Sequence, residues 1–202
     1  MPGSRVVLQN LHIIPPPSGT TIEIFGRRDV KLHGLTHDEQ SGAGGSAISL
    51  VCCYNFAISA TDPEARTPLG GSAYPIVLSN CQKGLVSGCS IHSTWHCIAI
   101  GGGSFPGAVP SRQILIDHCI LLNDMEQGAG AADSHGNSES ITYSNCIMSG
   151  ANLGGKNISA FGCTIYGRPP SVFPDGAAVW ASEIVGGVFR VHDCTVHLFG
   201  QG

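Results

Sequence analysis

The sequence predicts an all-β protein, a right-handed parallel β-helix (solenoid) with loop insertions on one edge. Charged residues make up only 12% of the 202 residues, while 28 Gly and 12 Pro together approach a fifth of the chain. That composition is typical of short strands joined by tight turns. A short motif of alternating apolar residues, two bend-forming residues and Cys-x-apolar also recurs along the chain. Recurrence of one structural unit favours a solenoid, in which every coil stacks on the previous one.

Five segments carry this motif: GLVSGCSIHS (84–93), ILIDHCILLN (114–123), ITYSNCIMSG (141–150), ISAFGCTIYG (158–167) and FRVHDCTVHL (189–198). The segment DVKLHGLTHD (29–38) matches them with Gly34 in place of the cysteine. A period of two marks half-buried strands, so Ile114 and Ile116 are expected to point inward. After the corner, Cys119 and Leu121 are expected to do the same.

A third strand is predicted in each coil, because short apolar runs precede most of these segments, at 47–50, 75–78, 97–100, 130–133 and 177–180. The motif cysteines are 30, 27, 17 and 31 residues apart. Variable coil length argues against the strict hexapeptide rhythm of the left-handed form, and the 17-residue coil is short for the right-handed one. A β-sandwich with coincidental cysteines is the alternative, which five aligned corners disfavour.

The nine cysteines cannot all pair, and no Cys-x-x-Cys motif is present, which disfavours a zinc ribbon. Free cysteines are most often small buried apolar residues. We therefore expect a buried ladder of reduced thiols along the solenoid axis, formed by Cys89, Cys119, Cys146, Cys163 and Cys194.

We expect residues 1–202 to form a single domain, with an irregular N-terminal coil over 1–28 and repeating coils over 29–200, within a longer chain. Three insertions, at 60–74, 122–130 and 167–176, follow the third strand of their coils and should leave the solenoid at one corner. The insertion at 101–113 leaves from another corner. Stacked insertions usually form the binding face of a repeat protein.

The net charge of −4 gives no electrostatic basis for binding a nucleic-acid backbone, although a locally basic patch could still bind an anionic glycan. No apolar run reaches the eighteen residues or so that a membrane span needs. We expect no cofactor and no metal site, because His92 and His96 are four apart in a segment that is not helical and has no third ligand nearby.

Glycoside hydrolysis needs two carboxylates, one on either side of the scissile bond, and a lyase needs a base and a cation near the uronate. Asp124 and Glu126 lie in the 122–130 insertion, and Asp133 begins the next coil. Coils stacked about 5 Å apart would place Asp133, Lys156 and Glu183 on one face, with the two carboxylates about 10 Å apart. These residues are candidates for catalysis, with Lys156 as a carbohydrate ligand.

His135 is a further candidate for catalysis, because histidine titrates near neutral pH. The alternative is structural: Asp133 and His135 would satisfy backbone groups at a coil corner, beside a turn at Gly136. Trp95 and His96 are candidates for carbohydrate binding, since a Trp face stacks on sugar rings. Their alternative is a partly buried aromatic corner.

The blocks ADSHGNSESITYSNCIMSG and LGGKNISAFGCTIYG resemble the pectate-lyase-like superfamily, and most closely the β-helix segments of bacteriophage tailspikes and tail fibres. The resemblance covers roughly residues 30–200. It implies a trimeric spike on the virion tail that binds, and often cleaves, host-surface polysaccharide. The paired-Asp pattern of polygalacturonases and the Arg-containing lyase signature are not found. No catalytic residue is therefore carried over from the family.

Three functions remain open. The first is a tailspike or tail-fibre segment that recognises host-surface polysaccharide and could degrade it. The second is a free-standing polysaccharide lyase or glycoside hydrolase of the same fold. The third is a structural shaft of a virion or adhesin. Open solenoid ends expose strand edges, so we expect capping by flanking domains or by neighbouring subunits, in a homotrimer.

Overall fold

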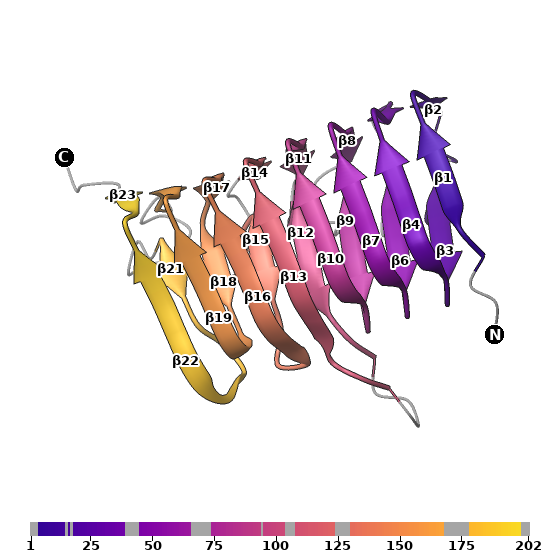
Figure 1. Cartoon of the computed structure of the whole chain (residues 1–202). Helices are drawn as coiled ribbons and strands as arrows, with labels where there is room; N and C mark the ends of the chain where they lie inside the picture. Colours follow the sequence, from indigo (N-terminus) through magenta and orange to yellow (C-terminus); the bar gives the residue numbers. More distant parts are fainter. Residues whose placement is uncertain are drawn as a thin grey trace.

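The computed structural model describes residues 4–14, 16, 18–38, 45–65, 74–93, 95–103, 108–123, 130–167 and 178–198. Their strands wind into a stack of coils with three parallel sheets as its faces (Figure 1). The predicted parallel β-helix is confirmed. Among the described residues there is no helix long and apolar enough to cross a membrane.

Each coil contributes one strand to each sheet, except that the last described coil has none in sheet 3, and all pairing is between neighbouring coils. Sheet 1 contains β1 (Val6–Gln9), β4 (Arg28–His33), β7 (Tyr54–Ser59), β10 (Gln82–Ser87), β13 (Ser111–Asp117), β16 (Ser138–Ser144), β19 (Gly155–Phe161) and β22 (Ile184–His192). Sheet 2 contains β2 (His12–Ile13), β5 (Thr36–His37), β8 (Asp62–Ala65), β11 (Ser90–Ser93), β14 (Ile120–Asn123), β17 (Ile147–Ser149), β20 (Thr164–Tyr166) and β23 (Thr195–His197). Sheet 3 contains β3 (Ile22–Phe25), β6 (Ile48–Val51), β9 (Ile76–Ser79), β12 (Ile98–Gly101), β15 (Ala132–Ser134), β18 (Ala151–Leu153) and β21 (Val179–Trp180).

The first coil contributes one strand to each sheet. β1 pairs in register with β4, β2 with β5, and β3 with β6. This coil is hard to recognise in the sequence, because it lacks the cysteine corner that marks the later ones. Asn10 has the positive φ found at the later corners, and Leu11 stands where those corners have cysteine.

The core is a set of columns running along the axis. In sheet 1 one column contains Val30, Phe56, Gly84 and Ile114, which are paired coil by coil. A Cβ on Gly84 would lie 2.0 Å from Cζ of Phe56, so the phenyl ring fills the space of the missing side chain. Large and small residues therefore compensate between neighbouring coils, which keeps the core close-packed.

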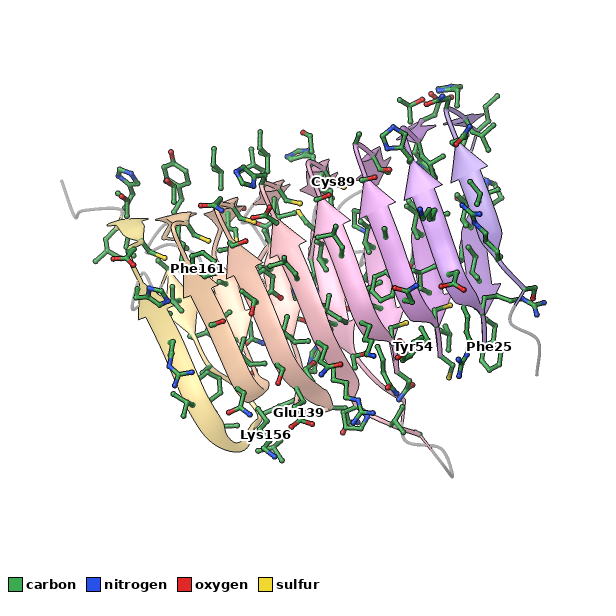
Figure 2. All side chains as sticks on the ribbon, in the orientation of Figure 1. Phe25, Tyr54, Cys89, Glu139, Lys156 and Phe161 are labelled. Atoms are coloured by element: carbon green, nitrogen blue, oxygen red, sulfur yellow. The ribbon has the colours of Figure 1, made fainter. Side chains whose placement is uncertain are left out.

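The five motif cysteines lie where sheet 1 turns into sheet 2, and Figure 2 marks this corner at Cys89. Each thiol faces a backbone carbonyl of the preceding coil; Cys119 and Cys146, for example, donate to Val86 O and Ile116 O, both at 3.6 Å. The preceding residue has a positive φ at every one of these corners, as at His118 and Asn145. The bend residues therefore supply the left-handed turn, and the cysteines satisfy carbonyls inside it. All nine cysteines are free thiols.

A second ladder, which the sequence analysis missed, lies where sheet 3 turns into sheet 1. Cys53, Cys81, Ser111 and Ser138 donate to carbonyls of the preceding coil, at Ile24, Leu50, Leu78 and Ile100, over 2.9–3.3 Å. Because two of its members are serines, it could not be recognised from cysteine spacing. Thiol and hydroxyl groups are equivalent here as small donors.

The 17-residue coil closes through glycines. Gly150 alone, with φ of 77°, joins β17 to β18, and Gly154 alone joins β18 to β19. A Cβ on Gly154 would lie 2.3 Å from Ser182 O and 2.4 Å from Ser134 O. Only glycine lets the backbones of the three coils approach this closely.

The insertions at 122–130 and 167–176 each lead from a strand of sheet 2 to a strand of sheet 3, at one corner as expected. The segment 60–74 instead begins after β7 of sheet 1, and only its part after β8 leads to sheet 3. The insertion at 101–113 joins β12 of sheet 3 to β13 of sheet 1, which is a different corner. Sheet 3 therefore lies between the two corners that carry the long connections.

Candidate functional site

The outer face of sheet 3 changes character along the axis. Its outward column begins with Glu23, runs through the small residues Ser49, Val77 and Ala99, and continues with Asp133 and Asn152, each paired with the next in register. Inward neighbours such as Ile98 are fully buried in the core. Small side chains on β6, β9 and β12 thus lead to a polar group on β15 and β18.

A pocket of about 400 Å³ lies on this face. It is lined by Val77, Ser79, Ala99, Gly101, Gly102, Gly103, His135, Asn137 and Glu183. The small residues come from β9, β12 and the segment that follows β12. His135 and Glu183 are the ionisable side chains that line it. The pocket therefore has one side made of small residues and another that carries an acid–base pair.

Asp133 is fully buried beside this pocket. Its Oδ2 lies 2.5 Å from Nε2 of His135 and 3.5 Å from Nε2 of His96. Its Oδ1 accepts a hydrogen bond of 2.7 Å from Nδ2 of Asn152 on the next coil. A buried carboxylate is stable only when it is paired and hydrogen-bonded in this way. Asp133 therefore contacts other side chains of the site and not the solvent.

His135 lies between two carboxylates. Its Nε2 contacts Asp133, and its Nδ1 lies 3.5 Å from Oε2 of Glu183. The contact with Asp133 is the main reason that the pKa of His135 lies above its usual value; partial burial opposes this increase, and the charges of Asp133 and Glu183 add to it. The imidazole is thus biased toward its protonated form.

Glu183 follows β21, two coils after Asp133, yet its side chain extends back to the coil of Asp133. Its Oε2 accepts a 2.8 Å hydrogen bond from the backbone N–H of Gly136. The intervening coil has Gly154 and Gly155 at this corner, and no side chain blocks the approach. Glu183 also has φ of 55°, a conformation that costs a non-glycine residue energy and that is concentrated at functional sites.

An aromatic group borders the buried side of the cluster. The ring of His96 lies 5.4 Å from that of Tyr74, 5.6 Å from that of Trp95 and 6.5 Å from that of His135. Nδ1 of His96 lies 2.7 Å from Gly130 O, which fixes the ring against the start of the next coil. Trp95 is half-buried. His96 thus contacts Asp133, and Trp95 packs edge-on against the ring of His96.

The structure brings together Asp133, His135 and Glu183, with His96 in contact. It does not bring Lys156 to them: Lys156 is on β19 of sheet 1, where its Nζ lies 3.5 Å from Oε1 of Glu139 (Figure 2). The sheet changes at Gly155, so the next residue faces a different side of the solenoid. Asp124 and Glu126 lie outside the described residues.

Asn152 was not a candidate from the sequence, although it holds Asp133. Its Oδ1 also accepts hydrogen bonds from N and Oγ of Ser182, at 3.1 and 2.9 Å. One amide thus links the coil of Asp133 to the coil of Glu183. Aligning the pair Ala151-Asn152 with Ala132-Asp133 would have found it, because the two pairs are in register.

Residues 42–202 match the sequence profile of the family described as Gp49, pectin lyase-like. The chain belongs to this family. The match covers most of the sequence and starts before β6, so it includes every strand that forms the site. No curated protein sequence matches the chain.

Solved tailspikes have the same fold. The tailspike gp61 of Pseudomonas phage phi297 is 27% identical over 97% of this chain, with a TM-score of 0.85. The tailspike gp49 of Pseudomonas phage LKA1 is 30% identical over 96%, with a TM-score of 0.78. The Gp54 tailspike of Acinetobacter baumannii bacteriophage AP22, solved with a capsular saccharide of A. baumannii, is 28% identical over 88%, with a TM-score of 0.70.

This chain spans 32%, 32% and 27% of the lengths of those three tailspikes. The resemblance to phage tailspike β-helices that the sequence indicated is confirmed. The common region is the solenoid itself, and within it lies the pocket on sheet 3.

The pH dependence of stability should reveal the Asp133–His135 contact. Because the pKa of His135 is raised on folding, the stabilisation is fully present below about pH 6.5, the ordinary value, and is lost as the pH rises through the raised value. Melting temperatures of the wild type and His135→Asn, compared from about pH 5 to 9, should differ most at low pH and converge at high pH. A constant difference would mean that no titrating contact exists.

Proposed function

We propose that this chain is the polysaccharide-recognition part of a phage tailspike on the virion tail, and that it cleaves the polysaccharide in the pocket on sheet 3. Three similar structures are tailspikes, and one of them was solved with a capsular saccharide. The observation that carries the proposal of cleavage is the continuous series Asp133–His135–Glu183 at the wall of that pocket.

The roles follow from exposure. Side chains of His135 and Glu183 are 44% and 57% exposed, so both can touch a sugar, whereas Asp133 cannot. We assign Nδ1–H of His135 as the proton donor to the glycosidic oxygen, once the substrate displaces Glu183 from this nitrogen, and Glu183 as the carboxylate that stabilises the positive charge at the anomeric carbon. The neutral imidazole then takes the proton of the attacking water. Asp133 is a positioning residue, which fixes the imidazole and favours its protonated form by raising the pKa of His135.

The proposal of hydrolysis over elimination rests on charge. A lyase must neutralise the uronate, often with Arg, Lys or a metal. Among the described residues that line the pocket there is no Arg or Lys, and Lys156 faces sheet 1. His135 and Glu183 are the ionisable residues among the described lining, so the pocket offers no fixed cation for a uronate. This favours acid–base hydrolysis of a glycosidic bond over elimination.

The test is to incubate the protein with a panel of capsular and O-antigen polysaccharides, following both chain length and the absorbance of unsaturated uronates. Shortening without that absorbance is the expected result. Shortening with it would replace the hydrolase assignment by a lyase. An intact chain length across a broad panel, with binding retained, would overturn cleavage and leave recognition.

Recognition without cleavage is the second candidate function. The full burial of Asp133 favours it, because only one described carboxylate then faces the pocket, and hydrolysis ordinarily uses two. The two functions differ in one readout: a binding protein leaves a stable complex with a long polysaccharide, whereas a hydrolase releases oligosaccharides.

We further propose that the full spike is a homotrimer. The resemblance to phage tailspikes implies a trimeric spike, and the similarity to three solved tailspikes supports the proposal. Sedimentation analysis of the full-length protein should give a trimer; a monodisperse monomer that melts cooperatively would contradict this.

A further inference from the structure

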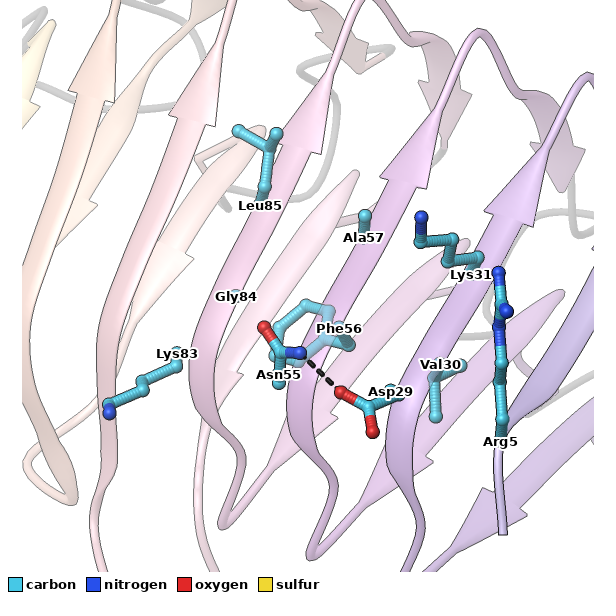
Figure 3. A pocket seen from close by; sticks show the side chains of 10 residues that line it. All are labelled: Arg5, Asp29, Val30, Lys31, Asn55, Phe56, Ala57, Lys83, Gly84 and Leu85. Atoms are coloured by element: carbon cyan, nitrogen blue, oxygen red, sulfur yellow. Dashed lines mark hydrogen bonds between the residues drawn. The ribbon is translucent and has the colours of Figure 1, made fainter. Parts of the chain in front are cut away.

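A second pocket, of about 650 Å³, lies on the outer face of sheet 1, away from the site on sheet 3. It is lined by Arg5, Asp29, Val30, Lys31, Asn55, Phe56, Ala57, Lys83, Gly84 and Leu85. Figure 3 shows Lys31 beside Arg5 at one side of the pocket and Lys83 at the other. We infer that this pocket binds an acidic polysaccharide, running along the solenoid axis over cations on the coils of β1, β4 and β10.

Charge is the first support. The lining has three cations, Arg5, Lys31 and Lys83, against the single carboxylate of Asp29, in a chain whose net charge is −4. That carboxylate accepts a hydrogen bond from Nδ2 of Asn55, so it is already partnered. A local excess of positive charge on an acidic protein attracts anions to this face.

The spacing of the cations favours a polymer over a single anion. Arg5, Lys31 and Lys83 come from different coils, and neighbouring coils stack about 4.8 Å apart. One phosphate could not contact all three, whereas a chain with a carboxylate on successive sugars could. Leu85 and Ala57, on the outer face between them, offer an apolar surface for the sugar rings.

An aromatic ring holds two cations beside the pocket. The ring of Tyr54 lies 5.1 Å from Nζ of Lys83 and 5.1 Å from the guanidinium carbon of Arg28. Cation–π contacts of this kind keep a long side chain in place while leaving its charge available. Lys83 is thus held at the edge of the pocket by its neighbour on β7.

The backbone of Lys83 supplies a control for the binding test. In six consecutive strands of sheet 1, from β4 to β19, one residue near the start has a positive φ: Asp29, Asn55, Lys83, Gln113, Ser140 and Asn157. Asn and Asp tolerate that conformation well, and lysine does not. Because the conformation recurs both inside and outside the pocket, it is a feature of the fold. Lys83 occupies a position that asparagine fills on the neighbouring coil, at Asn55.

This argument gives a matched pair of variants. Lys83→Asn relieves the strain and removes a charge inside the pocket, and Gln113→Asn relieves the same strain one coil further on, outside it. Both should raise the melting temperature, by about 2 °C. Only Lys83→Asn should weaken the binding of an acidic saccharide, by threefold or more.

The probe is an oligogalacturonate, titrated in the His135→Asn background so that the pocket on sheet 3 does not cleave it. We expect its affinity to fall with added salt, to fall about tenfold in Lys31→Gln/Lys83→Asn, and to stay unchanged in Gln113→Asn. A neutral oligosaccharide of equal length should not bind. Equal binding of the neutral oligomer, or an affinity that the double variant leaves unchanged, would overturn the inference.

Competition with inorganic pyrophosphate is the last part of the test. If it displaces the oligogalacturonate and binds more tightly, the pocket is a phosphate site, and an acidic saccharide is the wrong ligand. The inference does not depend on cleavage at sheet 3. Loss of cleavage in His135→Asn with binding retained at sheet 1, or the reverse, would separate the two sites.

Discussion

Replacing Gly154 by alanine is expected to destabilise the protein by about 3 kcal/mol, the upper range for overpacking. The new Cβ would lie 2.3 Å from Ser182 O and 2.4 Å from Ser134 O, on the coils at either side. Both atoms are backbone, so neither can move away as a flexible side chain would. The coils must separate instead, and the midpoint of urea denaturation measures the loss.

Gly101→Ala is the matched control. Gly101 ends β12 of the same sheet, and its added Cβ would make only ordinary contact, 3.4 Å from Cβ of His135. A loss of less than about 1 kcal/mol is expected there. If the two variants were equally stable, the close approach of coils at Gly154 would not exist.

The same substitution should also lower any activity. Ser134 follows Asp133, and Ser182 precedes Glu183, so the two carbonyls that flank Gly154 belong to the coils that carry the site. Pushing them apart separates Glu183 from His135 and from the N–H of Gly136. The short coil is therefore a part of the site as well as of the fold.

The sequence predicted the fold well because the corners are chemically distinctive. A left-handed bend residue followed by a buried thiol recurs at the turn between sheets 1 and 2, and that pattern gave both the coil length and the strand directions. Where the small donor was a serine, as at Ser111 and Ser138, the corner went unrecognised. Where no cysteine is present at the corner, as before Thr36, only the alternation of apolar and polar residues indicates the strand.

The site was predictable only in part, because stacking register does not say which way a corner residue faces. Asp133 and Glu183 were expected about 10 Å apart across a scissile bond. In the structure they contact opposite nitrogens of one imidazole, since glycines at 154 and 155 leave the intervening corner without side chains. Lys156, directly after those glycines, lies on the other sheet.

Replacing His135 by asparagine is expected to reduce kcat at least 100-fold on any polysaccharide that the protein cleaves, because general acid catalysis contributes about 10²–10⁴. Asparagine keeps a polar side chain in contact range of Asp133 but has no proton to transfer. His118→Asn is the control. His118 also pairs with an aspartate, at 2.7 Å from Asp117, but lies at the corner of sheets 1 and 2.

Asp133→Asn separates a positioning role from a merely structural one. The contact with Asp133 is the largest cause of the raised pKa of His135, so removing the charge should lower that pKa. If protonated His135 is the acid, activity falls as the pH rises through its pKa, and the variant should lose activity at a lower pH than the wild type. The pH profile of kcat on one substrate measures this.

The direction of that shift decides between the roles. A variant that is less active at every pH, with an unmoved profile, would mean that Asp133 only maintains the local structure through Asn152 and His96. A profile displaced to lower pH, with KM unchanged, would mean that the buried carboxylate sets the protonation of an imidazole that acts on the sugar. The second outcome is expected, because Asp133 is fully buried and can influence the pocket only through the groups it touches.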